Sequence, residues 1–308
     1  MTSLRDFNGK IASYGDIVRE ERFFCAVLFH LLLSNRDFLK LFIRQCTEPP
    51  FSFSENDTPR VFVEYAMARD LWEQIERDKN ADRIKAKFLL RWVKGLDGSL
   101  PEEPSKDDIA RFNEKIGSTR APKEDFHDHA ATSSKQSRSF IHTPGRWSIT
   151  KISESVFPND PEAIEEACKL KWAFNVKPDV VIELNQDSII CIEAKLGSRE
   201  SKYPPAKADI VALGKHFKGK RWTQTDIQQF LMEKILNFKC EGIHQVLLVM
   251  DQPSEDKKKT NLKYLTWKDV FDLMNEGHGK DARTQMAQEH AIVQTARHRI
   301  GNWGVTWA

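Results

Sequence analysis

The stretch from Lys177 to Gly197 constrains the fold more than any other part of the sequence. It contains two short runs rich in β-branched residues, Val180–Leu184 and Ile189–Ala194, on either side of a polar turn at Asn185–Ser188. This pattern predicts a β-hairpin. Side chains alternate between the two faces of a strand, so one face of the second run is apolar while the other carries an acid and a base.

The charged residues of this hairpin favour metal chemistry on a phosphate group. Asp179 opens the first strand, and antiparallel pairing brings it level with Glu193 in the second strand. Two adjacent carboxylates repel each other, and together they bind a hard cation such as Mg²⁺ well. Lys195 follows on the same side of the strand, where its ammonium group can contact a phosphate oxygen or a water molecule being deprotonated. We therefore expect Asp179 and Glu193 to be metal ligands and Lys195 to be a catalytic cation.

These residues carry a resemblance to a known family. Pro178-Asp179 and Glu193-Ala194-Lys195, with thirteen residues between the two acids, resemble the motif of the PD-(D/E)xK nuclease superfamily. The resemblance implies a restriction-endonuclease-like α/β fold, with a central mixed β-sheet flanked by helices. It implies a Mg²⁺-dependent nuclease, with Mn²⁺ as an alternative metal, in which the Ala194 carbonyl oxygen helps Asp179 and Glu193 to hold the ion.

The expected substrate follows from the same resemblance. It is DNA, with RNA left open, and the reaction is hydrolysis of phosphodiester bonds in restriction, defence or repair. Cutting both strands at one position needs a second active site, so a homodimer is compatible with this role. One alternative is a catalytically inactive member of the fold that acts as a nucleic-acid-binding or assembly module. Another is an unrelated scaffold whose hairpin has a merely solvated charged face.

The superfamily often places a Glu from the first core helix at the metal site. Asp16 to about Cys46 has apolar residues at helical spacing, which predicts one long helix. Glu21 shares a face with its apolar stripe and is the preferred candidate, with Glu20 in reserve. The alternative is that both acids form an acidic first turn that suits the helix dipole.

Several branches of the superfamily also use a Gln on the helix after the hairpin. Thr223 and Asp226 have the spacing of a capping box and predict a helix that runs to about Phe238. Gln228 is the preferred site residue on this helix and Gln224 is the reserve, although either can be a plain surface glutamine. The Tyr that often follows four residues after the Gln is replaced by Met232, which is a departure from the family pattern.

The remaining periodic segments predict helices and strands around the hairpin. We expect helices at Val61–Arg77, at Asp82–Val93, from Pro161 to about Trp172 after a cap at Asp160, after a cap at Thr266 and Asp269, and at Asp281–Arg299. We expect strands at Gly145–Ile152 and Gln245–Met250. We therefore expect a single domain over residues 1–308, with a helical and loop insertion at about 47–146 and an extra C-terminal helix.

The stretch from Gly95 to about Arg146 is rich in Gly, Pro, Ser, Lys and Asp, which predicts a long loop or lid near the substrate. We expect at most one short helix in it, near Asp107–Ile116. It contains acids and histidines that are compatible with metal binding, but a polar loop is the preferred interpretation because neither spacing nor setting is distinctive. These residues are Asp125, His127, Asp128 and His129.

A basic segment follows the hairpin. Between Arg199 and Arg221 there are seven Lys or Arg residues and two acids, a local charge of +5 that attracts a phosphate backbone. The alternative is an ordinary solvated surface. Gly214–Lys220 matches the beginning of a phosphate-binding loop, but Arg221 stands where such a loop needs Ser or Thr, so we do not expect an NTPase.

The bulk properties limit the cellular setting. The chain has 308 residues and a formal net charge of +2, so any attraction to nucleic acid must be local. Its five cysteines are scattered without a CxxC pair, which favours reduced thiols. The longest apolar run is too short to span a bilayer. We expect a cytoplasmic protein that makes no membrane contact.

Overall fold

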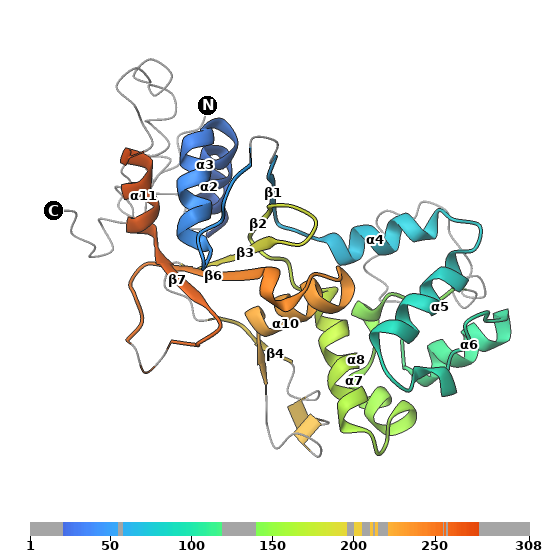
Figure 1. The fold of residues 1–308 in the computed structure, drawn as a ribbon. Helices are drawn as coiled ribbons and strands as arrows, with labels where there is room; N and C mark the ends of the chain where they lie inside the picture. The colour runs from blue at the N-terminus through green and yellow to red at the C-terminus, as the bar shows by residue number, and fades with distance from the viewer. Residues whose placement is uncertain are drawn as a thin grey trace, which may run out of the picture. The chain divides into compact units, whose positions relative to one another are not determined.

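The computed structural model describes residues 21–54, 58–118, 140–195, 200–204, 210–211, 213–214, 221–254, 256 and 258–276. Over these residues the chain is an α/β protein with a central mixed five-stranded sheet (Figure 1). It divides into two compact units. Unit 1 comprises Met1–Tyr65, Pro178–Arg199 and Phe238–Ala308, and unit 2 comprises Ala66–Lys177 and Glu200–Asn237.

The five-stranded sheet belongs to unit 1. Its strands lie in the order β1 (Arg60–Val63), β2 (Val180–Glu183), β3 (Ile189–Ala194), β6 (Ile243–Val249) and β7 (Lys263–Thr266). The pairs β1–β2 and β2–β3 are antiparallel, whereas β3–β6 and β6–β7 are parallel. The predicted hairpin is thereby confirmed as β2 and β3, and the strand predicted at Gln245–Met250 is confirmed as β6.

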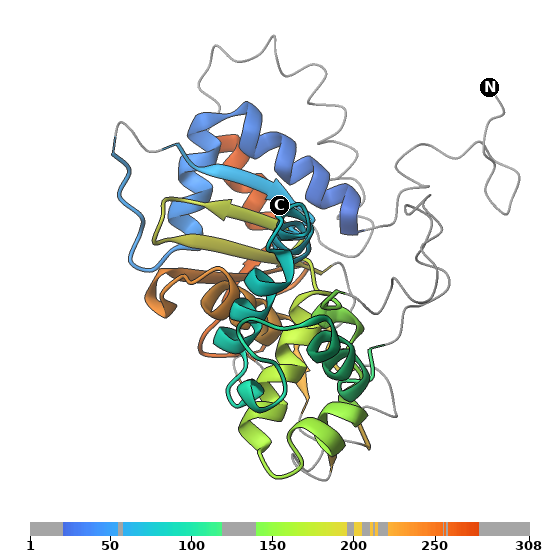
Figure 2. The same cartoon turned by 90° about the vertical axis from the view of Figure 1, so that its right-hand side faces the viewer.

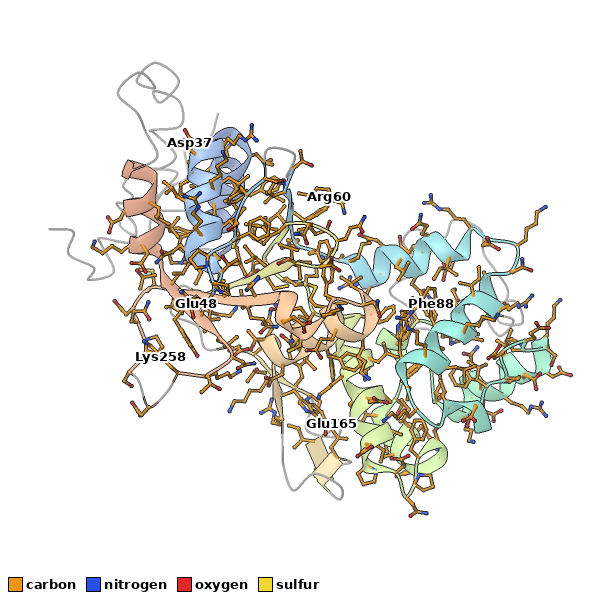
Figure 3. The ribbon with its side chains drawn as sticks, viewed as in Figure 1. Asp37, Glu48, Arg60, Phe88, Glu165 and Lys258 are labelled. Carbon is orange, nitrogen blue, oxygen red and sulfur yellow. The ribbon has the colours of Figure 1, made fainter. Side chains whose placement is uncertain are left out.

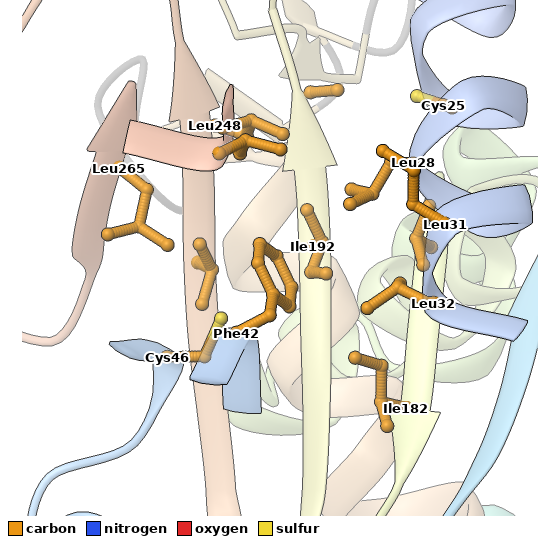
Figure 4. Close-up of a cluster of buried hydrophobic side chains, with 14 of the residues drawn as sticks. Cys25, Leu28, Leu31, Leu32, Phe42, Cys46, Ile182, Ile192, Leu248 and Leu265 are labelled. Atoms are coloured by element: carbon orange, nitrogen blue, oxygen red, sulfur yellow. The ribbon is translucent and has the colours of Figure 1, made fainter. Parts of the chain in front are cut away.

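One face of this sheet is covered by α2 (Glu21–Ser34), α3 (Arg36–Cys46) and α11 (Trp267–Glu276) (Figure 2). Leu28 of α2 and Phe42 of α3 are fully buried beside Ile192 of β3 (Figure 4). The alternate residues of each strand supply the apolar face, as their period of two requires. Burial of these side chains provides the main driving force for folding unit 1.

The predicted single helix from Asp16 to Cys46 is wrong in one respect, because two helices occupy its described part. Asn35 separates them with an extended backbone, and its side-chain oxygen accepts a hydrogen bond from the Phe38 N–H at 2.9 Å. Asn favours such capping positions because its short amide competes with the helical backbone. The hydrophobic periodicity continues across the break, so the sequence pattern did not show that the first helix ends at Ser34.

The helix predicted at Val61–Arg77 is also wrong at its beginning. Residues 60–63 form edge strand β1, and the helix, α4, spans only Met67–Glu76. The sequence Val-Phe-Val suits a strand, and its antiparallel partner β2 lies more than a hundred residues further along the chain. Glu64 has a positive φ of 49° where the chain turns out of the strand.

Unit 2 is mostly helical. Besides α4 its longer helices are α5 (Ala81–Trp92), α6 (Lys106–Lys115), α8 (Pro161–Ala173) and α10 (Gln224–Phe230), and short strands β4 (Lys202–Tyr203) and β5 (Trp222–Thr223) pair with each other. The remaining short elements are η1 (Leu96–Gly98), η4 (Pro144–Arg146), α7 (Ile149–Lys151), η5 (Ile152–Val156) and η6 (Leu231–Ile235), while η7 (Cys240–Gly242) belongs to unit 1. The strand predicted at Gly145–Ile152 is therefore wrong, because Pro144 and Gly145 begin a helical turn and Ser148 caps the next one.

A buried cation lies inside unit 2. Lys85 is 1% exposed, and its ammonium nitrogen lies 2.8 Å from Glu76 Oε1 and 4.8 Å from the centre of the Trp72 ring. Cation–π contact and the ion pair together compensate for the desolvation of this charge. Lys85 therefore ties α5 to α4.

The helix starts predicted from capping residues are confirmed. Asp160 accepts a hydrogen bond from the Ala163 N–H at 3.0 Å at the start of α8. Thr223 and Asp226 form a reciprocal capping box for α10, and Thr266 is hydrogen-bonded to Asp269 at the start of α11. The short helix expected near Asp107–Ile116 is α6.

Some predictions lie outside the described residues. These are the cluster at Asp125, His127, Asp128 and His129, the middle of the predicted loop at residues 119–139, and the C-terminal helix at Asp281–Arg299. All five cysteines do lie within the described part, and none of them forms a disulfide there. No described helix has both the length and the apolar composition needed to cross a membrane.

Candidate active site

Asp179 is fixed at the entrance to β2 by three hydrogen bonds. Its N–H donates to the Ile192 carbonyl at 3.1 Å, and its carbonyl accepts from the Glu64 N–H at 2.9 Å. Its side-chain Oδ2 accepts from the Ala194 N–H at 2.8 Å. Glu64, directly after β1, and two residues of β3 therefore hold the Asp179 backbone and side chain in place.

The hydrogen bonds of Asp179 place it beside the end of β3. The hairpin ladder ends at the pair Val180–Ile192, and the Asp179 contacts go to Ile192 and Ala194, on either side of Glu193. Ile192 and Ala194 belong to the core on the side of α2, α3 and α11, so Glu193 lies on the other face of β3, because side chains alternate along a strand.

Glu193 and Lys195 form a buried ion pair at the end of β3. Lys195 Nζ lies 2.6 Å from Glu193 Oε1, and the exposed fractions of the two side chains are 11% and 1%. The Lys195 N–H donates to the Leu248 carbonyl of β6 at 2.7 Å, which holds the backbone in place. Charges removed from water interact more strongly than exposed charges do, so this pair dominates the local electrostatics.

The same face carries a second polar cluster around Glu183 of β2. Glu183 accepts a hydrogen bond from the Tyr65 hydroxyl at 2.9 Å and is ion-paired with Arg60 of β1. Burial raises the pKa of Tyr65, and the hydrogen bond to Glu183 raises it further. Tyr65 is therefore neutral at physiological pH and acts as a hydrogen-bond donor to β2.

The thiol closest in the strand to Glu193 is not a nucleophile. Cys191 lies two residues before it and is 1% exposed. Burial raises the pKa of Cys191, so the thiolate that nucleophilic chemistry requires does not form. The chemistry available at this end of β3 is therefore that of carboxylates and an ammonium group.

The structure places the other predicted site residues differently. Glu21 is the first residue of α2, but its side chain, like the whole of Glu20, lies outside the described residues. Gln228 is 1% exposed on α10, and Gln224 begins the same helix. Both glutamines belong to unit 2, whereas Asp179, Glu193, Ala194 and Lys195 belong to unit 1.

The sequence interpretation missed Gln245 as a neighbour of the candidate site. Gln245 pairs with Cys191 in the parallel register and is 4% exposed, so it shares the face that carries Glu193. A glutamine inside the apolar run Gln-Val-Leu-Leu-Val-Met was the available signal. Buried amides need hydrogen-bonding partners, so such a position seldom arises from packing alone.

Two of the seven cations of the predicted basic segment, Lys202 and Arg221, fall within the described residues. Arg221 donates a hydrogen bond to the Lys202 carbonyl at 2.8 Å, while the other five cations lie outside the described residues. Among the described residues, no group of three or more His, Cys, Asp or Glu side chains could hold a metal ion.

Comparison with known proteins gave no further assignment, because no family model, curated protein or solved structure matches the chain.

Proposed function

We propose that this protein is a Mg²⁺-dependent nuclease of the PD-(D/E)xK type, with a restriction-endonuclease-like fold. One observation carries the proposal. Asp179 Oδ2 accepts a hydrogen bond from the N–H of Ala194, the residue after Glu193, and the Lys195 ammonium nitrogen is 2.6 Å from a Glu193 oxygen. Two carboxylates with an adjacent cation, at the end of a strand, are the groups that metal-assisted phosphodiester hydrolysis needs.

The donor set fits Mg²⁺, and Mn²⁺ as an alternative. Magnesium prefers oxygen ligands and keeps several waters, so one or two carboxylates plus substrate phosphate oxygens commonly hold it. Asp179 and Glu193 supply two such carboxylates, and the resemblance adds the Ala194 carbonyl oxygen.

A bound Mg²⁺ would lower the pKa of a coordinated water and neutralise charge on the phosphate. The residues of this chain have separate tasks. The Ala194 N–H holds Asp179 Oδ2 in one orientation, so the carboxylate is preorganised. Lys195 has three N–H donors, so it can contact Glu193 and also donate to the attacking water or to a phosphate oxygen. Its low exposure strengthens that contact.

The proposed substrate is DNA, with RNA as the alternative. The basic segment between Arg199 and Arg221 follows the hairpin directly and carries a local charge of +5 in the sequence, which favours a polyanionic partner. Restriction, defence and repair are all compatible with such an activity. A homodimer would supply the second active site for cutting both strands of a duplex.

A second candidate is a catalytically inactive protein of this fold that binds nucleic acid or assembles with partners. The buried ion pair favours it, because Lys195 already compensates the Glu193 charge without a metal. The two candidates differ in one respect: only the nuclease needs Glu193 to exchange its cation for a metal.

A plasmid assay separates the two candidates. Supercoiled DNA is incubated with the full-length protein in Mg²⁺, in Mn²⁺ and in excess EDTA, and a parallel reaction contains single-stranded RNA. The nuclease predicts nicked or linear DNA, or shortened RNA, with a divalent metal and none with EDTA. Binding of DNA without cleavage in either metal would identify the inactive module and reject the nuclease.

A further inference from the structure

Unit 1 contains a polar pocket that the proposed nuclease does not use. Its volume is about 390 Å³, within the usual size range for small-molecule sites. Its walls come from the end of α3, the start of β6, the segment before β7 and the start of β7. Figure 3 labels two of the lining residues, Glu48 after α3 and Lys258 before β7.

The pocket and the candidate active site lie at opposite ends of β6. Ile243, which lines the pocket, pairs with Ile189 at the start of β3, whereas Leu247 pairs with Glu193 near its end. Four residues of strand separate the two pairs, about 13 Å. The pocket is therefore a separate site on the same sheet.

The walls of the pocket are held by hydrogen bonds. The Lys259 N–H donates to the Tyr264 hydroxyl at 3.1 Å, and the Gln252 side chain donates to the Tyr264 carbonyl at 3.1 Å. Leu262 and Cys46 are buried and give the pocket an apolar part. The segment before β7 is thus already folded back onto the strand, as a preformed binding site requires.

The charges that line the pocket favour an anionic ligand. Lys263 is ion-paired with Glu48, and this contact lowers the pKa of Glu48, so the two charges cancel. Burial lowers the pKa of His244, which is therefore neutral at physiological pH. Lys258 then gives the described lining a net charge of +1.

The other lining groups indicate which anion fits. Thr260 and Asn261 can each donate a hydrogen bond, and Tyr264 offers an aromatic ring. Lysine is a common phosphate ligand, and no arginine, whose planar fork matches a carboxylate, lines the described pocket. Burial raises the pKa of Cys46, so a thiolate that would bind a soft metal does not form.

We propose that this pocket binds a small phosphate monoester of mononucleotide size. Lys258 contacts the phosphate group, Thr260 and Asn261 hydrogen-bond to the polar body of the ligand, and Tyr264 packs against its ring.

Isothermal titration calorimetry of the full-length protein without divalent metal tests this site. The probes are adenosine 5′-monophosphate, adenosine and inorganic phosphate. We expect the monophosphate to bind most tightly, phosphate more weakly and adenosine at least about tenfold more weakly than the monophosphate, because a charge pair near the surface readily supplies that factor. Equal binding of adenosine and its monophosphate, or no binding of either phosphate compound, would overturn the proposal.

Variants locate the binding. Lys258→Gln removes the charge but keeps an unbranched polar side chain, and it should weaken monophosphate binding at least about tenfold. Lys259→Gln is the matched control, because Lys259 is the next residue but does not line the pocket; an equal loss in this control would reject the site. Circular dichroism shows whether each variant is folded.

Asp179→Asn separates this inference from the proposed nuclease. It should bind the monophosphate as the parent protein does, whether or not the protein cleaves DNA. If Asp179→Asn abolishes binding while Lys258→Gln does not, the nucleotide occupies the candidate active site and the pocket inference fails.

Discussion

The two ends of the sheet in unit 1 each carry a Lys–Glu pair, but in opposite surroundings. At the end of β3 the Glu193 side chain is 1% exposed and that of Lys195 is 11% exposed. At the start of β7 the Lys263 side chain is 30% exposed and that of its partner Glu48 is 74% exposed. The pair at the end of β3, the dry end, is nearly excluded from water, whereas the pair at the start of β7, the wet end, is in contact with water at the mouth of a pocket.

This difference indicates what each end can do. A charge pair in a dry site interacts strongly and can stabilise charge that develops during a reaction. An exposed pair contributes about 1 kcal/mol or less to stability, but a ligand can reach it easily. The dry end is therefore suited to chemistry, and the wet end to reversible binding of a small anion.

The largest expected effect is at the dry end. Asp179→Asn keeps a side-chain oxygen for the Ala194 N–H but removes the charge that holds the metal. We expect the plasmid cleavage rate in Mg²⁺ to fall by at least about 10³-fold, or ~4 kcal/mol of activation free energy. The matched control is Asp187→Asn in the exposed turn of the same hairpin, which should cleave at the parent rate. Equal losses in both variants would point to a folding defect.

Stability should also distinguish the two ends. Lys195→Met leaves the Glu193 carboxylate buried without its cation, so we expect the free energy of unfolding to fall by about 3 kcal/mol. Adding Glu193→Gln should recover more than half of that loss, because no buried charge then remains. Urea unfolding of both variants measures the difference. A loss below about 1 kcal/mol in the single variant would show that the pair is effectively hydrated.

A smaller effect is expected from pH at the wet end. Burial lowers the pKa of His244 from its ordinary value of 6.5. The unfolded chain therefore takes up a proton before the folded protein does, so stability is complete above pH 6.5 and declines as the pH falls below it. One such group changes stability by at most about 1.4 kcal/mol per pH unit. His244→Gln should flatten this part of the stability–pH curve; an unchanged slope would assign it to other groups.

The smallest effect should come from Glu48→Gln. It breaks an ion pair whose partners remain hydrated, so the free energy of unfolding should change by about 1 kcal/mol or less. Thermal unfolding at low and high salt measures it, and the small difference should shrink in salt because exposed charges are screened. A loss as large as that of Lys195→Met would remove the contrast between the two ends.

Sequence reasoning succeeded where the signal is local. The β2–β3 hairpin follows from two β-branched runs and a polar turn, and Asp160, Thr223 and Thr266 mark helix starts because a cap involves only neighbouring residues. It failed where partners are distant. Nothing near Val61 shows that it pairs with Ile182, so strand β1 was interpreted as part of a helix.

The candidate site shows the same limit. Strand alternation was enough to place Glu193 and Lys195 on the same side of β3, because only one residue separates them. It did not reveal that Lys195 folds back onto Glu193, since that depends on burial of both side chains. The sequence also did not predict the pocket at the start of β6, because its residues Glu48, His244 and Lys258 come from three distant segments.

The most direct test of the central claim compares catalysis with binding in Lys195→Met. At one fixed salt concentration, the plasmid cleavage rate is measured in Mg²⁺ and DNA affinity in Ca²⁺, with Lys268→Met on α11 as the exposed control. If Lys195 acts on the attacking water or the transition state, cleavage should fall by roughly 10²–10³-fold, while affinity changes by less than about tenfold and the control matches the parent. A folded Lys195→Met protein that cleaves at the parent rate would contradict the proposed chemistry.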